Sequence, residues 1–116
     1  MKTLSILNDG PYGSECTYNG LRLAGTFSKH EGDKVHVFLI GDATSAAHRS
    51  PKVPQGFYNV ETMTGNVIRH NGKIGIRRTC TEARATCDSD IADGTRRSTL
   101  AELAKWTTWS DKTVVF

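Results

Sequence analysis

Short apolar runs alternate with longer, helix-like segments along this chain, and this alternation limits its fold more than any other feature. Residues 35–40 are almost continuously apolar, a pattern typical of a parallel strand covered on both faces. Three further runs, at residues 2–7, 73–77 and 113–116, also predict strands. Strands that alternate with helices form repeated βα units. The sequence therefore predicts an α/β fold in which helices cover both faces of a mainly parallel sheet.

The segments between these runs predict helices, and several of their ends carry capping signals. Thr99 and Glu102 have the S/T-x-x-E spacing of a capping box, which predicts a helix at 99–110. Ser14 is a suitable N-cap residue for a helix at 14–29, in which small residues such as Gly20 would let the helix lie close to the sheet. Further helices are predicted at 57–70 and, in shorter form, at 43–48 and 79–85.

Size, charge and cysteine content exclude several classes of protein. A chain of 116 residues has the usual size of one domain, so residues 1–116 are expected to form a single domain. The net charge is only +3, without a long run of Lys or Arg, so neither nucleic acid nor a membrane is expected as a partner. The odd number of cysteines, three, does not suggest a secreted disulfide scaffold, and no signal peptide is recognised. We therefore expect a cytoplasmic protein.

Three loops are the first places to look for a functional site. Ligands of parallel α/β folds gather beyond the carboxyl ends of the strands. With the predicted strand order along the chain, the loops at that edge are residues 8–14, 41–56 and 77–82. The third of these loops contains a cysteine, Cys80.

Cys80 is the main candidate for a catalytic residue. It directly follows a predicted strand, and Thr79 and Glu82 have the spacing of a capping box that would make Thr79 the N-cap. Unpaired N–H groups at a helix start favour a thiolate, which is the nucleophilic form of cysteine. Arg77, Arg78 and Arg84 would add positive potential if they turn toward the sulfur. The alternative is a buried cysteine that packs as a small hydrophobe.

The other candidate residues carry weaker signals. Asp9, Gly10, Gly13 and Ser14 could form an anion-binding loop before the first helix, although a plain turn explains the same residues. The four histidines have no metal-ligand spacing, so no metal site is expected, and His48 is the one that could approach Cys80 as a base. Cys16 and Cys87 are weaker thiol candidates. Trp106 and Trp109 suit core packing or an oligomer interface.

Several segments of the chain together resemble the DsrE/DsrF-like (YchN-like) proteins. The resemblance covers essentially the whole chain, and it is the joint occurrence of the segments that makes it specific. The segment Thr79-Cys80-Thr81-Glu82-Ala83-Arg84 contains the cysteine. The other similar segments are residues 8–15, 38–43, 52–59, 103–106 and 111–116.

This resemblance implies a three-layer α/β/α sandwich with a mainly parallel sheet of four to five strands, assembled into homotrimers or hexamers. Better-known relatives pass sulfur as a cysteine persulfide without a cofactor, and the matching position here is Cys80. The implied partners are sulfur-donor and acceptor proteins or small thiols. Close relatives often have C-G-T-C before this helix and a glycine after it. Here Arg77, Arg78 and Ala85 stand at those positions, which excludes a two-thiol C-x-x-C mechanism.

Two functional hypotheses follow from the sequence. The first is a sulfurtransferase-like carrier that accepts sulfane sulfur on Cys80 and passes it to an acceptor thiol. The second is a non-enzymatic, oligomeric binding protein whose strand-end pocket holds a small anionic ligand or a partner segment. A flavodoxin-like cofactor protein is a third interpretation, but the loops that such a cofactor requires are not recognised in the sequence.

Overall fold

A five-stranded, all-parallel sheet forms the centre of the molecule. The computed structural model describes residues 1–12, 15–47 and 60–116. The strand order is β4-β3-β2-β1-β5, and each neighbouring pair is parallel. The strands are β1 (Lys2–Leu7), β2 (Lys34–Leu39), β3 (Lys73–Arg77), β4 (Thr95–Ser98) and β5 (Lys112–Val115).

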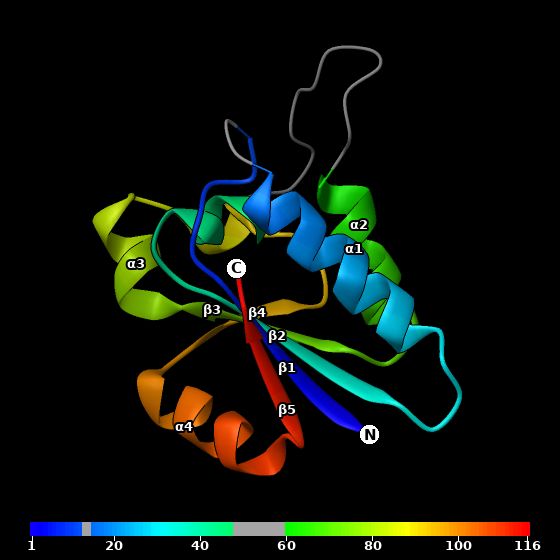
Figure 1. Cartoon of the computed structure of the whole chain (residues 1–116). Helices are drawn as coiled ribbons and strands as arrows, with labels where there is room; N and C mark the ends of the chain where they lie inside the picture. Colours follow the sequence, from blue (N-terminus) through cyan, green and yellow to red (C-terminus); the bar gives the residue numbers. More distant parts are fainter. Residues whose placement is uncertain (13–14, 48–59) are drawn as a thin grey trace.

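Helices cover the two faces of this sheet unequally (Figure 1). The chain passes from β1 to β4 in one direction across the sheet, and α1 and α2 lie on one face. It then returns from β4 to β5 at the opposite edge, with α4 on the other face, as right-handed crossovers require. The α-helices are α1 (Cys16–Ser28), α2 (Val60–Arg69), α3 (Arg78–Ala83) and α4 (Leu100–Trp109), and the 3₁₀ segments are η1 (Gly41–Ala47) and η2 (Asp88–Asp90). This arrangement confirms the predicted sandwich.

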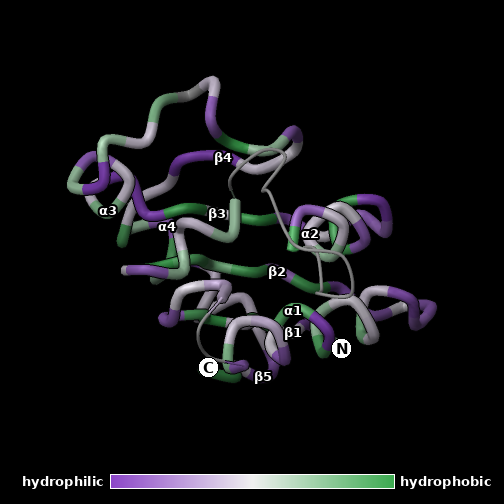
Figure 2. The backbone as a smooth tube through the Cα atoms, turned by 90° about the horizontal axis from the view of Figure 1, so that it is seen from above, coloured by the Kyte–Doolittle hydropathy of each residue, from purple (hydrophilic) through white to green (hydrophobic). Residues whose placement is uncertain are grey.

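The apolar core is divided between the two faces by the alternation of side chains along the strands. On the α1/α2 face, Val37, Leu39 and Ile74 belong to a large buried cluster. On the α4 face, a smaller cluster joins Leu4, Phe38 and Trp106. Because β2 contributes to both clusters, it is buried on both sides, and Figure 2 shows it as a largely hydrophobic segment between the other strands.

Glycine allows close packing on each face. A Cβ atom at Gly20 would lie 2.4 Å from Leu7 Cδ2, so only glycine lets α1 approach β1 this closely, as the sequence predicted. On the other face, a Cβ atom at Gly75 would lie 3.1 Å from the Trp106 ring. Trp106 therefore packs directly onto the backbone of β3.

The predicted elements agree with the structure except at a few boundaries and one strand. β4 was not predicted, because Thr95-Arg96-Arg97-Ser98 contains no apolar residue and polar residues are tolerated at a sheet edge. The segment predicted as a short helix at 43–48 is the 3₁₀ segment η1, and α1 begins at Cys16 with Glu15 at the N-cap position. Ser14, His48 and residues 57–59 lie outside the described residues.

The capping signal at the start of α4 is confirmed. The Thr99 side chain accepts a hydrogen bond from the Glu102 backbone N–H at 3.2 Å. The Glu102 carboxylate accepts from Arg96 at 2.6 Å and from Ser98 at 2.8 Å, so it joins the helix start to β4. Glu102, which the capping pattern identified, therefore also forms a tertiary contact between α4 and β4.

Replacement of Trp106 tests the packing of α4 on the sheet. The Trp106 side chain is only 7% exposed, and it contacts Phe38 and Gly75. We expect Trp106→Ala to lower the free energy of unfolding by about 3–5 kcal/mol, because a large cavity remains. Lys105→Ala on the same helix is the control, since Lys105 is exposed and its loss should change stability by less than about 0.5 kcal/mol. Equal denaturation midpoints for the two variants would contradict this packing.

Candidate functional site

Cys80 lies in α3, which follows β3 without an intervening loop. The N-cap residue of α3 is Arg77, in an extended conformation and without a side-chain cap, so the predicted capping role of Thr79 is wrong. Thr81 explains the earlier start, because its side chain is fully buried and its hydroxyl donates to the Arg78 carbonyl at 2.6 Å. Thr79 and Glu82 are exposed, and Cys80 is the third residue of the helix.

The Cys80 sulfur accepts a hydrogen bond from a backbone amide of another loop. The Gly41 N–H lies 3.3 Å from Sγ, although the two residues are 39 positions apart. Gly41 has a φ of +61°, a left-handed conformation that favours glycine. Its N–H donates to α3 just after the end of β2. Hydrogen bonds to charged acceptors are stronger than those to neutral ones, so this amide suits an anionic sulfur.

Arg84 is held beside the thiol by other groups. Its guanidinium binds Asp42 Oδ1 through two nitrogens, at 2.6 and 3.2 Å, and donates to the Cys80 carbonyl at 3.1 Å. The sequence suggested that Arg84 could add positive potential at the sulfur. In the structure, its guanidinium instead faces the Asp42 carboxylate. Arg84 instead joins α3 to the loop that carries Gly41, and so maintains the amide–sulfur contact.

Arg77 and Arg78 lie at a neighbouring hollow. This hollow has a volume of about 270 Å³, and the part of the chain that the structure describes contributes six lining residues. Cys80 is not among them, so the two arginines belong to a separate strand-end pocket at the start of α4. The lining residues are Arg77, Arg78, Thr79, Ser98, Thr99 and Leu100.

The first loop reaches the same edge of the sheet. A Cβ atom at Gly10 would lie 3.9 Å from Asp42 Cβ, and the Asp9 carbonyl accepts from Thr17 at 2.5 Å. The topology thus brings the described parts of all three predicted loops together. Gly13 and Ser14 of the predicted anion-binding loop lie outside the described residues, as does His48, the candidate base.

The remaining candidates lie apart from the hydrogen-bonded thiol. Cys16 and Cys87 are both free and exposed, whereas Cys80 is half-buried.

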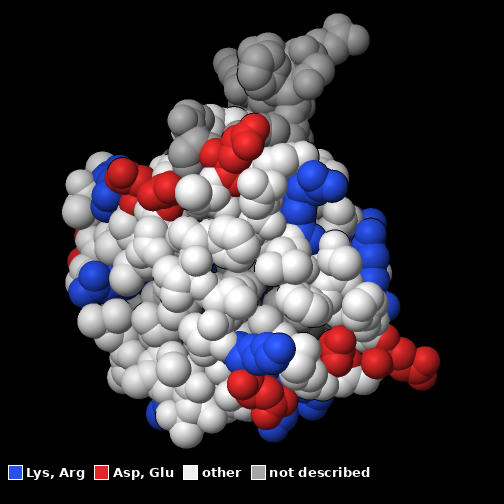
Figure 3. All heavy atoms as spheres, viewed as in Figure 1, with Lys and Arg blue, Asp and Glu red and all other residues white. Residues whose placement is uncertain are grey.

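Within residues 1–12, 15–47 and 60–116, no group of His, Cys, Asp or Glu is suited to hold a metal ion. None of the helices in this part of the chain combines the length and apolar character that crossing a membrane requires. In the view of Figure 3, Lys and Arg are scattered and interspersed with acidic residues.

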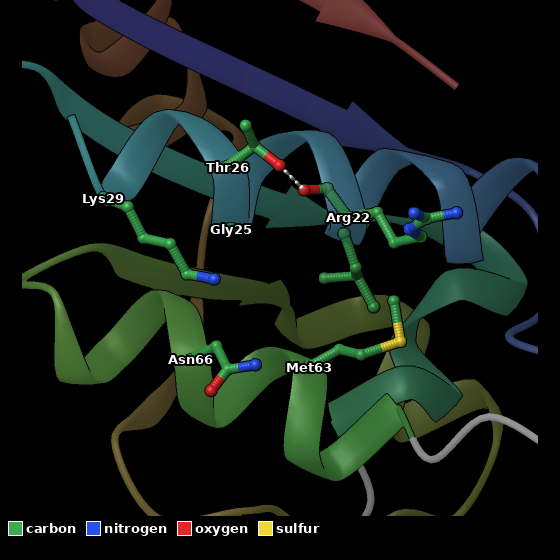
Figure 4. Close-up of a pocket in the computed structure, with 7 residues that line it drawn as sticks. Arg22, Gly25, Thr26, Lys29, Met63 and Asn66 are labelled. Atoms are coloured by element: carbon green, nitrogen blue, oxygen red, sulfur yellow. Dashed lines mark hydrogen bonds between the residues drawn. The ribbon is translucent and has the colours of Figure 1, made fainter.

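A further hollow, of about 230 Å³, lies between α1 and α2 (Figure 4). Lys29 from α1 and Asn66 from α2 reach into it from opposite sides. A Cβ atom at Gly25 would have nothing within 4 Å, which confirms that the two helices leave open space here. The hollow is lined by α1 and α2 residues, so it does not extend the Cys80 site.

The chain matches known proteins over its full length. The family model described as "DsrE/DsrF-like family" matches residues 1–116. The chain belongs to the DsrE/DsrF-like family. This confirms the resemblance on which the sequence-based expectations depended.

Comparisons with individual proteins give the same family at the level of sequence and the same fold at the level of structure. Protein YchN of Escherichia coli strain K12 is 35% identical over 116 residues, which cover 99% of this chain and 98% of YchN. The crystal structure of the Escherichia coli protein superposes with a TM-score of 0.90 and covers 100% of both chains. The protein of unknown function MTH1491 from Methanobacterium thermoautotrophicum, at 8% identity and a TM-score of 0.75 over 99% of this chain and 98% of its own, shares the fold alone.

Two glycine replacements test the backbone geometry around the thiol. Gly41→Ala places a side chain at a φ of +61°, so we expect a loss of about 1–2 kcal/mol in the free energy of unfolding. Gly25→Ala is the matched control: it fills open space in α1, so its higher helix propensity should stabilise the protein by about 0.5–1 kcal/mol. Chemical denaturation measures both effects. A Gly41→Ala protein as stable as wild type would show that this left-handed turn is not required.

Proposed function

We propose that this DsrE/DsrF-like protein carries sulfane sulfur as a persulfide on Cys80 and passes it to an acceptor thiol. The observation that supports the proposal most is the Gly41 N–H donated to Sγ at 3.3 Å, at the edge where parallel α/β folds bind their ligands. Membership of the DsrE/DsrF-like family favours the same chemistry.

The proposed reaction is balanced without a redox partner. The Cys80 thiolate attacks the outer sulfur of a donor persulfide, R–S–SH; the Cys80 S–S bond forms, the donor S–S bond breaks, and the donor leaves as the thiolate R–S⁻. The proton stays on the transferred sulfur. An acceptor thiolate then attacks this outer sulfur and receives it as a persulfide, while Cys80 departs as a thiolate. Each step is a thiol–disulfide type of exchange.

One cysteine is sufficient for this sequence of steps. Arg77 stands where close relatives often have the first cysteine of C-x-x-C. The proposed steps return Cys80 to its thiolate form without a second cysteine. In this proposal the Gly41 amide holds the sulfur anion before loading and after release. The Asp42–Arg84 pair keeps the Gly41 loop beside α3. Arg77 and Arg78 would attract anionic donors by their charge.

The proposed partners are sulfur-donor and acceptor proteins or small thiols in the cytoplasm, where thiols remain reduced. We also propose assembly into homotrimers or hexamers. Two exposed apolar side chains support this, because Val115 of β5 is 64% and Leu100 of α4 49% exposed. Exposed apolar surface of this kind favours protein contacts.

Sulfur loading in solution tests the function. The protein is incubated with glutathione persulfide, and its intact mass is measured before and after treatment with a thiol reductant. We expect wild type to gain the mass of one sulfur atom in a reductant-reversible manner, and Cys80→Ser to gain none. Cys16→Ser and Cys87→Ser are matched controls that should load like wild type, because it is the Cys80 sulfur that accepts the Gly41 hydrogen bond. Loading that persists in Cys80→Ser would exclude the proposal.

The strand-end hollow favours a second candidate function, the binding of a small anion without sulfur transfer. Arg77 and Arg78 line this hollow of about 270 Å³ together with Thr99, the N-cap residue of α4. Helix starts and arginine side chains both attract anions. In a calorimetric titration with inorganic phosphate, this candidate requires binding that Arg78→Gln weakens roughly tenfold, the effect of one lost charge-assisted hydrogen bond. Phosphate binding that is unchanged in Arg78→Gln would exclude this second candidate function.

A further inference from the structure

A hollow of about 500 Å³ lies at the end of the sheet opposite Cys80. It surrounds the amino ends of β2 and β3, whereas Cys80 follows the carboxyl end of β3. Its volume lies within the range of about 300–1,000 Å³ that is typical of small-molecule sites. The side chains that matter here are those of Lys34, His36, His70, Asn71, Lys73 and Trp109.

The strand register places three basic side chains together in this hollow. His36 of β2 is the direct neighbour of Lys73 of β3, so both side chains stand on the same face of the sheet. Lys34 lies two residues before His36 and therefore on that face as well. The two lysines and the histidine thus line the hollow from one strand end without a long loop to position them.

Aromatic stacking forms the inner wall. The His36 ring lies parallel to the Trp109 ring, with centroids 3.9 Å apart and an interplanar angle of 7°. The His36 ring also contacts the Trp106 ring, with centroids 4.4 Å apart and an interplanar angle of 51°. Trp109 also carries the Lys2 ammonium 5.8 Å from its ring centre. These contacts fix the imidazole, and His36 Nδ1 is buried without a hydrogen-bond partner among the described residues.

The charge of the hollow is positive near neutral pH. Among the described residues that line it, the one carboxylate, that of Asp33, already accepts from the Met1 amino group at 3.0 Å and lies 3.4 Å from His30 Nδ1. Burial is the largest cause that lowers the pKa of His36, and together with the charges of Lys73, Arg96 and Lys34 it brings this pKa to about 4, while Glu102 opposes the shift. The imidazole is therefore neutral at pH 7, and Lys34 and Lys73 supply the positive charge.

We propose that this hollow is a binding site for a small anion that carries phosphate or carboxylate groups, held between the ammonium groups of Lys34 and Lys73 against the His36–Trp109 wall. An anion would relieve the repulsion between these two ammonium groups and provide charge-assisted hydrogen bonds to each. His70 and Asn71 line the side toward α2, where Asn71 has the left-handed conformation that follows the helix end. The proposal does not depend on sulfur chemistry at Cys80.

The stacked imidazole provides an internal reporter for the site. An anion beside Lys34 and Lys73 offsets part of the positive charge that lowers the His36 pKa, so binding should raise this pKa from about 4 toward its ordinary value of 6.5. By thermodynamic linkage, protonation of His36 should in turn tighten anion binding. For a given charge state of the anion, affinity is therefore expected to increase as the pH falls from the raised pKa of the bound form toward about 4. A structural role of the lysines alone would not produce this coupling.

Nuclear magnetic resonance titrations at low salt test the proposal. Inorganic phosphate and citrate are added separately to the ¹⁵N-labelled protein, and the His36 ring protons are followed against pH with and without each anion. We expect saturable shifts at Lys34, His36 and Lys73 and a higher His36 pKa. A response to phosphate alone would identify a phosphorylated ligand, and a response to citrate alone a carboxylate.

Variants separate specific binding from general attraction to a basic protein. Lys34→Gln and Lys73→Gln should each weaken binding roughly tenfold, the size of one lost charge-assisted hydrogen bond. Lys105→Gln is the charge-matched control, because Lys105 is exposed on α4 and does not line the hollow, and it should bind like wild type. Cys80→Ser should also bind like wild type, which keeps this result distinct from the outcome of sulfur loading. A His36 pKa that neither anion changes, or equal losses in Lys73→Gln and Lys105→Gln, would overturn the proposal.

Discussion

The parallel pairing of β2 with β1 on one side and β3 on the other is the constraint on which the rest of the structure depends. Parallel pairing aligns the strands so that all of their carboxyl ends meet at one edge and all of their amino ends at the other. β2 contributes apolar side chains to both faces, so this register is strongly specified by burial. A slip by one residue would move each of its side chains to the wrong face.

At the carboxyl edge, this pairing brings a backbone amide to a thiol. Gly41 follows the end of β2, and Cys80 follows the end of β3. Because these strands are neighbours in the sheet, the Gly41 N–H and the Cys80 sulfur lie within hydrogen-bond distance. The contact needs no charged side chain, and Arg84 faces Asp42 instead of the sulfur. A backbone donor also has a fixed position, because it is held by the strand and by the left-handed conformation of Gly41 at the start of η1. In the proposed function, this fixed donor replaces the role that the sequence suggested for the arginines.

At the amino edge, the same pairing aligns His36 with Lys73 beside the end of α4. Here the helix contributes its last residue, Trp109, to a stack that keeps an imidazole neutral among positive charges. The two edges are linked by the rigid central strands but share no lining residue among those described. We therefore regard the thiol site and the proposed anion site as chemically independent, and the loss of one should leave the other intact.

The predictions that succeeded from sequence were those that depend on local patterns. Apolar runs predicted β1, β2, β3 and β5, and the Thr99–Glu102 spacing predicted the cap of α4. The same spacing at Thr79 and Glu82 failed, because α3, in which Thr81 is buried, starts two residues earlier than a Thr79 cap would allow. β4 was not predicted, because an edge strand can be polar and this one lacks the apolar pattern that identifies buried strands.

The sequence by itself determined the α/β architecture and the place of Cys80 just after a strand, because both follow from periodicity and from residue order. Only the tertiary structure decided which group faces the sulfur and which partner Arg84 takes, since Gly41 and Asp42 lie far from α3 along the chain. It also decided that His36 stacks on Trp109. The physical reason is the same in each case. Hydrophobic periodicity reports which side chains are buried, but a contact between distant segments depends on strand order and register, which no local pattern contains.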